Sequence, residues 1–280
     1  MFFNLLQAEL YKIYSKPRSY IGFAALFLIS ALIHFALYAD GKSYINIVTQ
    51  SLQQSFAVEG NILNGNLVCY IILQMLIIHV PLLIALVTGD LMSGEGASGT
   101  LRLLVLKPVS RMQIFIAKFI AGSFYTATIL IFLAIVAWGL GILFFGKGDL
   151  MILRSEEITI LPANDISWRF FAAFGAAFIA LTVVSAISFM LSCFSNNSVG
   201  PIISTMAIII LFTIIATLDL PSFQTIHPYM FTTHLVAWHM FFENPVPYHE
   251  ILNSMLILLL HIVGCLGIAA WHFTRKDILV

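Results

Sequence analysis

Six apolar runs, each long enough to cross a bilayer, constrain this chain of 280 residues more than any other feature. Hydrophobic residues make up 60% of it and charged residues only 9%, so a soluble globule could not cover its apolar surface. Backbone groups in hydrocarbon must be satisfied within their own segment, and barrel strands would alternate polar and apolar residues. We therefore expect an all-α integral membrane protein with a single transmembrane domain over residues 1–280. The six runs are Tyr20–Tyr38, Leu67–Gly89, Gln113–Phe145, Trp168–Phe194, Val199–Leu218 and Ile251–Trp271.

The basic residues are distributed unevenly between the two sides of these six runs. If the amino terminus is cytoplasmic, nine of the thirteen Lys and Arg residues fall on the cytoplasmic side. Short cytoplasmic segments of membrane proteins carry such an excess, and an even number of spans brings the chain back to the side where it began. We therefore expect both termini to be cytoplasmic, in the cell (inner) membrane. The nine residues are Lys12, Lys16, Arg18, Arg102, Lys107, Arg111, Lys118, Arg275 and Lys276.

Residues 1–18 have the pattern of an amphipathic helix. Apolar side chains recur at helical spacing at Phe3, Leu6, Leu10 and Ile13, while the intervening residues are mostly polar. This pattern predicts an interfacial helix on the membrane surface. The alternative is an unstructured segment that merely precedes the first span.

A proline-rich segment, residues 219–250, lies on the outer side between the fifth and sixth runs. Its middle part, Tyr229–Phe242, is apolar but too short to span a bilayer. It predicts a re-entrant or interfacial piece before the last helix. An ordinary outer loop packed on the bundle is the alternative.

A charged and glycine-rich stretch, Asp90–Arg111, lies between the second and third runs. It reads DLMSGEGASGTLRLLVLKPVSR. We expect a short apolar helix over Leu101–Leu106, which Pro108 ends because its ring and missing N–H cannot continue the hydrogen-bond ladder. Ser110 and Gln113 have the spacing of a capping box and are predicted to start the next helix.

The short predicted helix is apolar on nearly all sides. Leu101 and Leu104 share one face, whereas Leu103 and Leu106 lie opposite. Such a helix favours burial on more than one side, in a groove of a partner protein with the bundle or lipid behind it. A passive amphipathic loop is the alternative, in which Glu95 would only offset the positive end of a helix dipole.

This stretch resembles the segment before the third membrane helix of ABC-2-type permeases. There an acidic residue, Gly-Thr-Leu, a Leu-rich turn and Pro-Val-Ser-Arg form a coupling helix that contacts the ATPase subunit. In layout the resemblance extends to the whole chain, including the amphipathic first helix and short re-entrant helices before the last span. It implies that the cytoplasmic coupling segment, residues 90–112, contacts an ATPase through Glu95, Gly99, Thr100, Leu101, Arg102, Leu103, Leu104, Lys107, Pro108 and Arg111.

The resemblance implies the permease subunit of a bacterial ABC exporter, built from two permease copies or one copy with a paralogue, above two ATPase subunits. A phosphate-binding loop is missing from this chain: the nearest string, Gly41-Lys42-Ser43, has Ala36 where the first glycine should stand. ATP and Mg²⁺ are therefore expected on the partner ATPase, with no cofactor and no enzymatic site in this chain. Membrane lipid is the other expected partner, and nucleic acid is not expected. The Phe-rich, nearly charge-free helices favour lipid-like or amphipathic cargo over ions.

Three histidines within the apolar runs support an alternative function. Ionisable groups inside a membrane are functional candidates by default, and two of His34, His79 and His261 could ligate a haem. The alternative is therefore a haem-binding membrane redox subunit. Neutral histidines hydrogen-bonded inside the bundle are the structural alternative. The spacings of the outer-segment histidines match no zinc motif, so no metal site is expected; these residues are His227, His234, His239 and His249.

Overall fold

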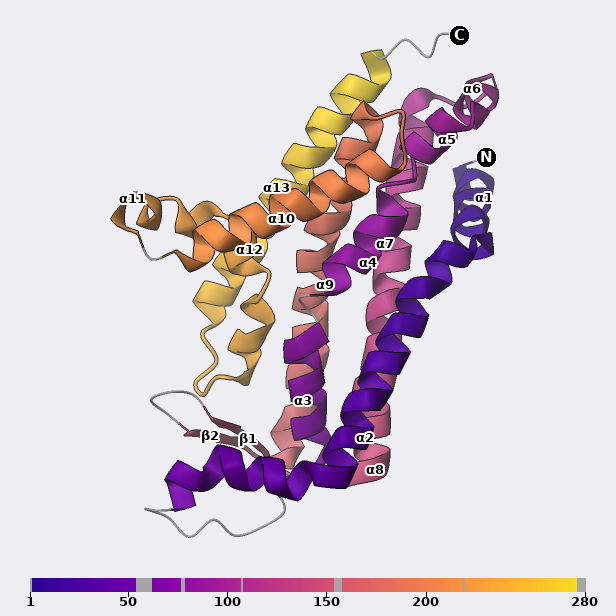
Figure 1. Cartoon of the computed structure of the whole chain (residues 1–280). Helices are drawn as coiled ribbons and strands as arrows, with labels where there is room; N and C mark the ends of the chain where they lie inside the picture. The colour runs from indigo at the N-terminus through magenta and orange to yellow at the C-terminus, as the bar shows by residue number, and fades with distance from the viewer. Residues whose placement is uncertain are drawn as a thin grey trace.

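The computed structural model in Figure 1 describes residues 2–53, 62–76, 79–106, 108–153, 158–218 and 220–275, without the side chains of residues 48, 51–53, 102, 105 and 221. Within these ranges, six helices are long and apolar enough to cross a membrane. The chain is thus an all-α membrane protein in class. Helix α1 (Phe2–Ser15) and the end of α13 (Tyr248–Arg275) lie at one end of the bundle, which we call the terminal end; a β-hairpin marks the opposite, hairpin end (Figure 1).

Five of the six predicted runs form continuous helical segments, as expected. Helix α2 continues well past Tyr38, and Figure 1 shows its last turns running sideways across the hairpin end. These segments are α2 (Pro17–Gln53), α7 (Arg111–Ala134) with η1 (Ile135–Gly139) and α8 (Leu140–Phe145), α9 (Ala163–Phe194), α10 (Val199–Thr217) and α13.

The second predicted run, Leu67–Gly89, is not one helix, and that prediction was wrong. It is divided into α3 (Gly65–Leu76) and α4 (Val80–Thr88), which point in different directions in Figure 1. Pro81 supplies the physical reason, because its missing N–H and its ring prevent an unbroken helical ladder. The helix that is long and apolar enough to span then runs over Val80–Ala97 and includes the beginning of the coupling segment.

A π-helical turn, η1, interrupts the third run and turns Trp138 towards α3. The indole Nε1 donates a hydrogen bond to Asn66 Oδ1 at 3.0 Å. Close by, the backbones of α3 and α8 nearly touch, because a Cβ on Gly65 would lie 2.5 Å from the carbonyl carbon of Gly141. Small residues allow membrane helices to approach this closely, and the contact fixes α3 at the hairpin end.

The segment between the third and fourth runs contains a two-stranded antiparallel hairpin. Strand β1 (Leu150–Leu153) pairs with β2 (Ile158–Leu161), with Leu150 opposite Leu161. The side chains of Leu150, Ile152 and Leu161 are buried in the main core. The alternation of buried and exposed residues in β2 explains the hairpin, because one face packs on the bundle.

Helix α9 is the centre of the bundle and packs against α4, α7, α10 and α13. In its most apolar stretch 67% of the residues are buried, against 11% for α10. Helix α10 crosses the bundle obliquely in Figure 1 with most of its apolar surface uncovered. That surface is available for lipid or for another protein chain.

The proline-rich segment before α13 contains four short helical turns within the described residues, and the last two of them pack on the bundle. Trp238 and Phe242 are fully buried there, and Arg169 of α9 donates hydrogen bonds to the carbonyls of Phe241 and Glu243, both at 2.8 Å. Whether the segment re-enters the membrane stays a prediction. The turns are α11 (Pro221–Gln224), η2 (His227–Tyr229), α12 (Phe231–His234) and η3 (Ala237–Phe242).

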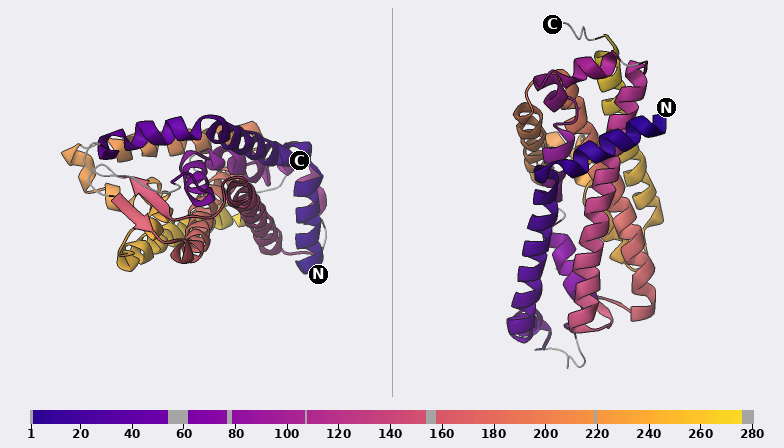
Figure 2. Two further views of the ribbon diagram at one scale, coloured as in Figure 1. Left: turned by 90° about the horizontal axis from the view of Figure 1, so that it is seen from below. Right: turned by 90° about the vertical axis from the view of Figure 1, so that its right-hand side faces the viewer.

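The first predicted helix is present as α1, and Figure 2 shows it lying crosswise to α7 beside the beginning of α2. Leu5, Glu9 and Ile13 are buried against the bundle, whereas Phe3 is exposed. A crossing orientation of this kind is compatible with an interfacial helix. Its contact with a membrane surface stays a prediction.

Candidate functional site

The predicted coupling segment forms two short helices at the terminal end. Helix α5 (Ser93–Ala97) is followed by α6 (Thr100–Val105), close to the expected Leu101–Leu106. Gly99 joins them with φ +72°, a left-handed conformation that glycine adopts without strain. The capping box is confirmed, since Ser110 Oγ accepts from the N–H of Gln113 and the Gln113 side chain accepts from the N–H of Ser110.

The leucines of α6, with Leu106 directly after its last residue, divide into an inward and an outward group. Leu104 is 9% exposed and packs with Leu5 of α1 and Ile114 of α7. Leu103 and Leu106 are 65% and 82% exposed. One side of this helix therefore lies on the bundle and the other is open, and burial of the open side in a groove of a partner stays a prediction.

Leu101 is half-buried against the main core. Of the three leucines expected to contact the partner, Leu101, Leu103 and Leu104, the structure leaves Leu103 largely exposed, and the neighbouring Leu106 is exposed as well.

Glu95 belongs to a closed ring of four charged side chains, which we call the Glu–Lys ring. Lys12 Nζ lies 2.7 Å from both Glu9 Oε1 and Glu95 Oε1. Lys118 Nζ lies 2.8 Å from both Glu9 Oε2 and Glu95 Oε2. Two lysines thus alternate with two glutamates, and the ring is electrically neutral.

The Glu–Lys ring ties three elements together. Glu9 and Lys12 come from α1, Glu95 from α5 and Lys118 from α7. Both Glu9 and Lys118 have side chains only 1% exposed. A buried charge is costly unless it is paired and hydrogen-bonded, so each of them constrains the other elements to stay in place. Burial lowers the pKa of Lys12, but the hydrogen bonds and charges of Glu9 and Glu95 outweigh it, so this pKa lies above its ordinary value.

Asp90 forms a second ionic contact beside the ring. Its Oδ2 lies 3.1 Å from Lys16 Nζ and also contacts the guanidinium of Arg18. A Cβ on Gly94 would lie 2.3 Å from Asp90 Oδ1, so only glycine leaves room for this carboxylate. The start of α2 is thereby connected to the start of the coupling segment.

The other predicted site residues lie around α6. Thr100 and Pro108 are exposed, and a half-buried Arg111 donates a hydrogen bond to the Thr274 carbonyl at the end of α13 at 3.2 Å. Lys107 and the side chain of Arg102 lie outside the described residues. The structure brings Glu95 into the ring and leaves Leu103, Thr100 and Pro108 on the surface.

Sequence reasoning missed the Glu–Lys ring, although two features indicated it. Glu9 lies at i, i+4 spacing between Leu5 and Ile13, on the side of α1 that turned out to be buried. Lys118 is a charge inside the third apolar run. Neither position reveals its partner, because Lys118 bonds to Glu9 from 109 positions away and Lys12 bonds to Glu95 from 83 positions away.

The three membrane histidines each bond to the backbone of their own segment. His34, His79 and His261 use Nδ1 to contact the carbonyl four residues earlier, at 2.7 to 2.8 Å. The ring of His34 packs on Phe144 and Phe145, and that of His261 on Phe231. Nothing in these contacts favours the haem alternative.

The whole chain matches one family model. The model described as ABC-2 family transporter protein covers residues 3–278. No curated protein matches the chain.

Proposed function

Because the chain belongs to the ABC-2 transporter family, we propose that it is the permease subunit of an ATP-driven exporter whose ATP is hydrolysed by a separate ABC ATPase. The observation that carries this proposal is the position of α6. It presents Leu103 and Leu106 outward at the terminal end while Leu104 anchors it to the bundle. An exposed apolar pair on a short anchored helix suits a groove in a partner protein.

In this proposal ATP and Mg²⁺ bind to the ATPase, and the permease supplies no bond chemistry. Closure of the ATPases displaces α6, and two kinds of contact transmit the displacement. Leu104 packs directly on α1 and α7, and Glu95 is bonded to Lys12 of α1 and Lys118 of α7. These contacts are short and partly buried, so α1 and α7 move with the coupling segment instead of yielding locally.

The terminal end is cytoplasmic in this proposal, and the protein lies in the cell membrane with both termini inside. The excess of basic residues at this end supports the orientation. A second permease copy or a paralogue completes the pathway. The largely uncovered apolar faces of α10 and α13 are available for that copy and for lipid.

One experiment tests the division of labour between the two subunits. The chain purified alone should hydrolyse no ATP, whereas the complex recovered from its native membrane should contain an ABC ATPase and hydrolyse ATP. Hydrolysis by the rigorously purified single chain would refute the proposal.

The docking surface is tested with Leu103→Asp and Leu106→Asp. A carboxylate buried without a partner in an apolar groove costs several kcal/mol, roughly a whole docking contact. Both variants should therefore lose the ATPase on co-purification while expression stays normal. Ile160→Asp is the matched control, because Ile160 is apolar and nearly as exposed as Leu103 but lies on β2 at the hairpin end. Undiminished co-purification with both leucine variants would assign α6 a passive role.

A further inference from the structure

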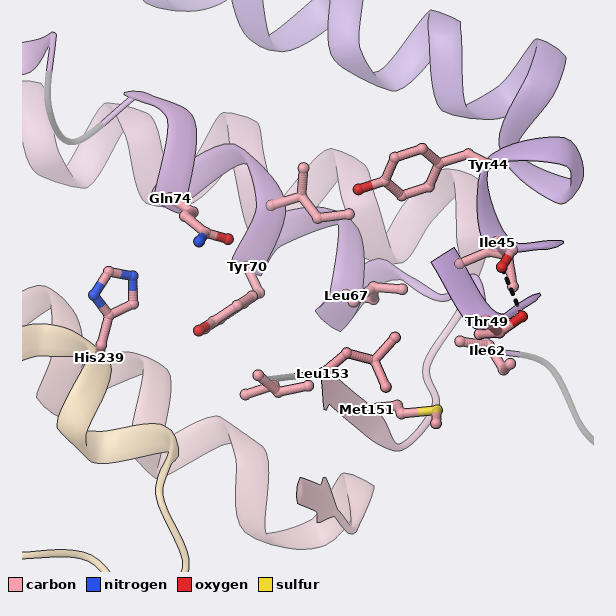
Figure 3. Close-up of a pocket in the computed structure, with 12 residues that line it drawn as sticks. Tyr44, Ile45, Thr49, Ile62, Leu67, Tyr70, Gln74, Met151, Leu153 and His239 are labelled. Carbon is pink, nitrogen blue, oxygen red and sulfur yellow. Dashed lines mark hydrogen bonds between the residues drawn. The ribbon is translucent and has the colours of Figure 1, made fainter. Parts of the chain in front are cut away.

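A pocket of about 420 Å³ lies at the hairpin end, far from the coupling segment. Figure 3 shows it between the outer part of α2, helix α3, strand β1 and η3. Its volume lies in the range of about 300–1,000 Å³ that is usual for small-molecule sites.

Polar and apolar side chains both line the pocket. Tyr70, Gln74 and His239 gather on one side, whereas Leu67, Met151 and Leu153 lie on the other, which Tyr44 and Thr49 also line (Figure 3). The polar side chains are two phenols, a carboxamide, an imidazole and a hydroxyl. Among the lining residues that the structure describes, none is Asp, Glu, Lys or Arg.

The walls of the pocket are held in place by the core. Tyr70 is 8% exposed, and its ring lies 5.8 Å from that of Trp238 and 5.2 Å from that of Phe242. The His239 ring lies 3.7 Å from the Trp238 ring. Helix α3, which carries Tyr70 and Gln74, is fixed by its close backbone contact with α8. A site with fixed walls loses little conformational entropy when a ligand binds.

The chemistry of the walls limits the ligand. Among the described residues that line the pocket, a charged headgroup would meet no opposite charge, so the loss of its hydration there is unfavourable. A hydrocarbon chain gains from contact with the leucines and methionine. A hydroxyl-bearing headgroup finds donors and acceptors in the carboxamide, the phenol and the imidazole.

We propose that this pocket binds a neutral amphipathic molecule, with a hydrocarbon part against Leu67, Met151 and Leu153 and an uncharged hydroxylated head near Tyr70 and Gln74. Building on the proposed permease function, the pocket is the outward-side substrate site. An amphipath that reaches it from the bilayer is released at the hairpin end.

The test uses a monoacylglycerol that carries a diazirine in its acyl chain, with the protein reconstituted in phosphatidylcholine nanodiscs. After irradiation, mass spectrometry maps the labelled residues. Labelling is expected at Met151 and Leu153. Unlabelled monoacylglycerol should suppress it, and the fatty acid of the same chain length, ionised at pH 8, should compete at least about tenfold more weakly.

Two variants separate a specific site from general lipid contact. Gln74→Leu keeps the side-chain size but removes the polar head contact, so competition by monoacylglycerol should weaken about tenfold. Gln7→Leu is the matched control, since Gln7 is an exposed glutamine on α1. Leu153→Trp fills the apolar side and should abolish labelling of Met151.

Three results would overturn the proposal. They are labelling that unlabelled monoacylglycerol does not suppress, equal competition by the fatty acid, and labelling confined to the wholly apolar groove between α7 and α9 around Phe171 and Phe174.

Retention of the ATPase by the Gln74→Leu and Leu153→Trp variants shows that they are folded. A failure of ATPase association in the unaltered chain would instead refute the permease function, so the two failures are distinguishable.

Discussion

Replacing Lys118 by methionine tests whether the Glu–Lys ring holds the coupling segment to the bundle. The side chain of Lys118 is 1% exposed, and its ammonium is paired with Glu9 and Glu95 at 2.8 Å. Methionine has a similar length and no charge, so the substitution leaves two carboxylates with Lys12 as their remaining ring partner.

The magnitude follows from the cost of breaking a buried ion pair. Removing one partner usually costs about 3–5 kcal/mol. Because Lys12 still lies 2.7 Å from both carboxylates, we expect the lower end, about 3 kcal/mol. For domains of 150–250 residues, a loss of 1 kcal/mol lowers Tm by about 2–4 °C, so the expected loss corresponds to a fall of roughly 6–12 °C in Tm.

A second substitution and a control complete the experiment. Glu9→Gln added to Lys118→Met restores the neutrality of the ring, so the double variant should recover part of the lost stability. Lys42→Met, at an exposed position of α2, should change stability by less than about 0.5 kcal/mol. Thermal unfolding in detergent is the assay. A Tm for Lys118→Met equal to that of Lys42→Met would refute the structural role of the ring.

Three further predictions concern the surroundings of the ring. Gly94→Ala should destabilise the protein by about 1–3 kcal/mol in thermal unfolding, because the new Cβ would displace the Asp90 carboxylate. Gly96→Ala should not, because a Cβ on Gly96 would lie 3.9 Å from its nearest neighbouring atom, and equal melting temperatures of the two variants would contradict the close contact at Gly94. Because the pKa of Lys12 is raised in the folded protein, the stabilising effect of Lys12 is complete below pH 10.5 and is lost as the pH rises through the higher folded-state pKa. The fall in Tm at alkaline pH should therefore be steeper in the unaltered chain than in Lys12→Met, and parallel curves of Tm against pH would contradict this role of Lys12. In a cysteine-free background, Lys12→Cys should react with an impermeant thiol reagent added on the cytoplasmic side, and Lys147→Cys with the reagent added on the outer side. The reverse pattern would contradict the proposed orientation.

Much of the fold follows from local features of the sequence. Solid apolar runs dictate spanning helices because backbone groups in hydrocarbon must bond within their own segment. The start of α7 was predictable to the residue because the capping box of Ser110 and Gln113 involves only neighbours. The end of α6 was predictable to within one residue for a similar reason, since a helix cannot continue through Pro108.

The features that depend on distant contacts were not predictable. The division of the second run is different, because Pro81 is a local signal; the apolar residues on both sides of it made the run look like one span. The hairpin forms because Leu150 and Leu161 find a place in the core, which the local sequence does not reveal. The Glu–Lys ring joins α1, α5 and α7, and nothing in the spacing of Glu9, Glu95 and Lys118 shows that these side chains meet.

The inward orientation of the Leu104 side chain also depends on distant contacts. The pattern of α6 shows leucines on every side and does not tell which side the bundle covers. Only the contact with Leu5 and Ile114 decides that Leu103 and Leu106 remain open.

Photo-crosslinking from α6 tests the central claim most directly. A photoreactive amino acid is placed at Leu103, at Leu106 or, as a control, at Ile160, and the complex is irradiated in native membranes. The account predicts covalent adducts with an ABC ATPase from both α6 positions and none from Ile160. An intact permease–ATPase complex that yields no adduct from either leucine, or yields one from Ile160, would contradict the claim that α6 is the contact through which ATP hydrolysis drives this permease.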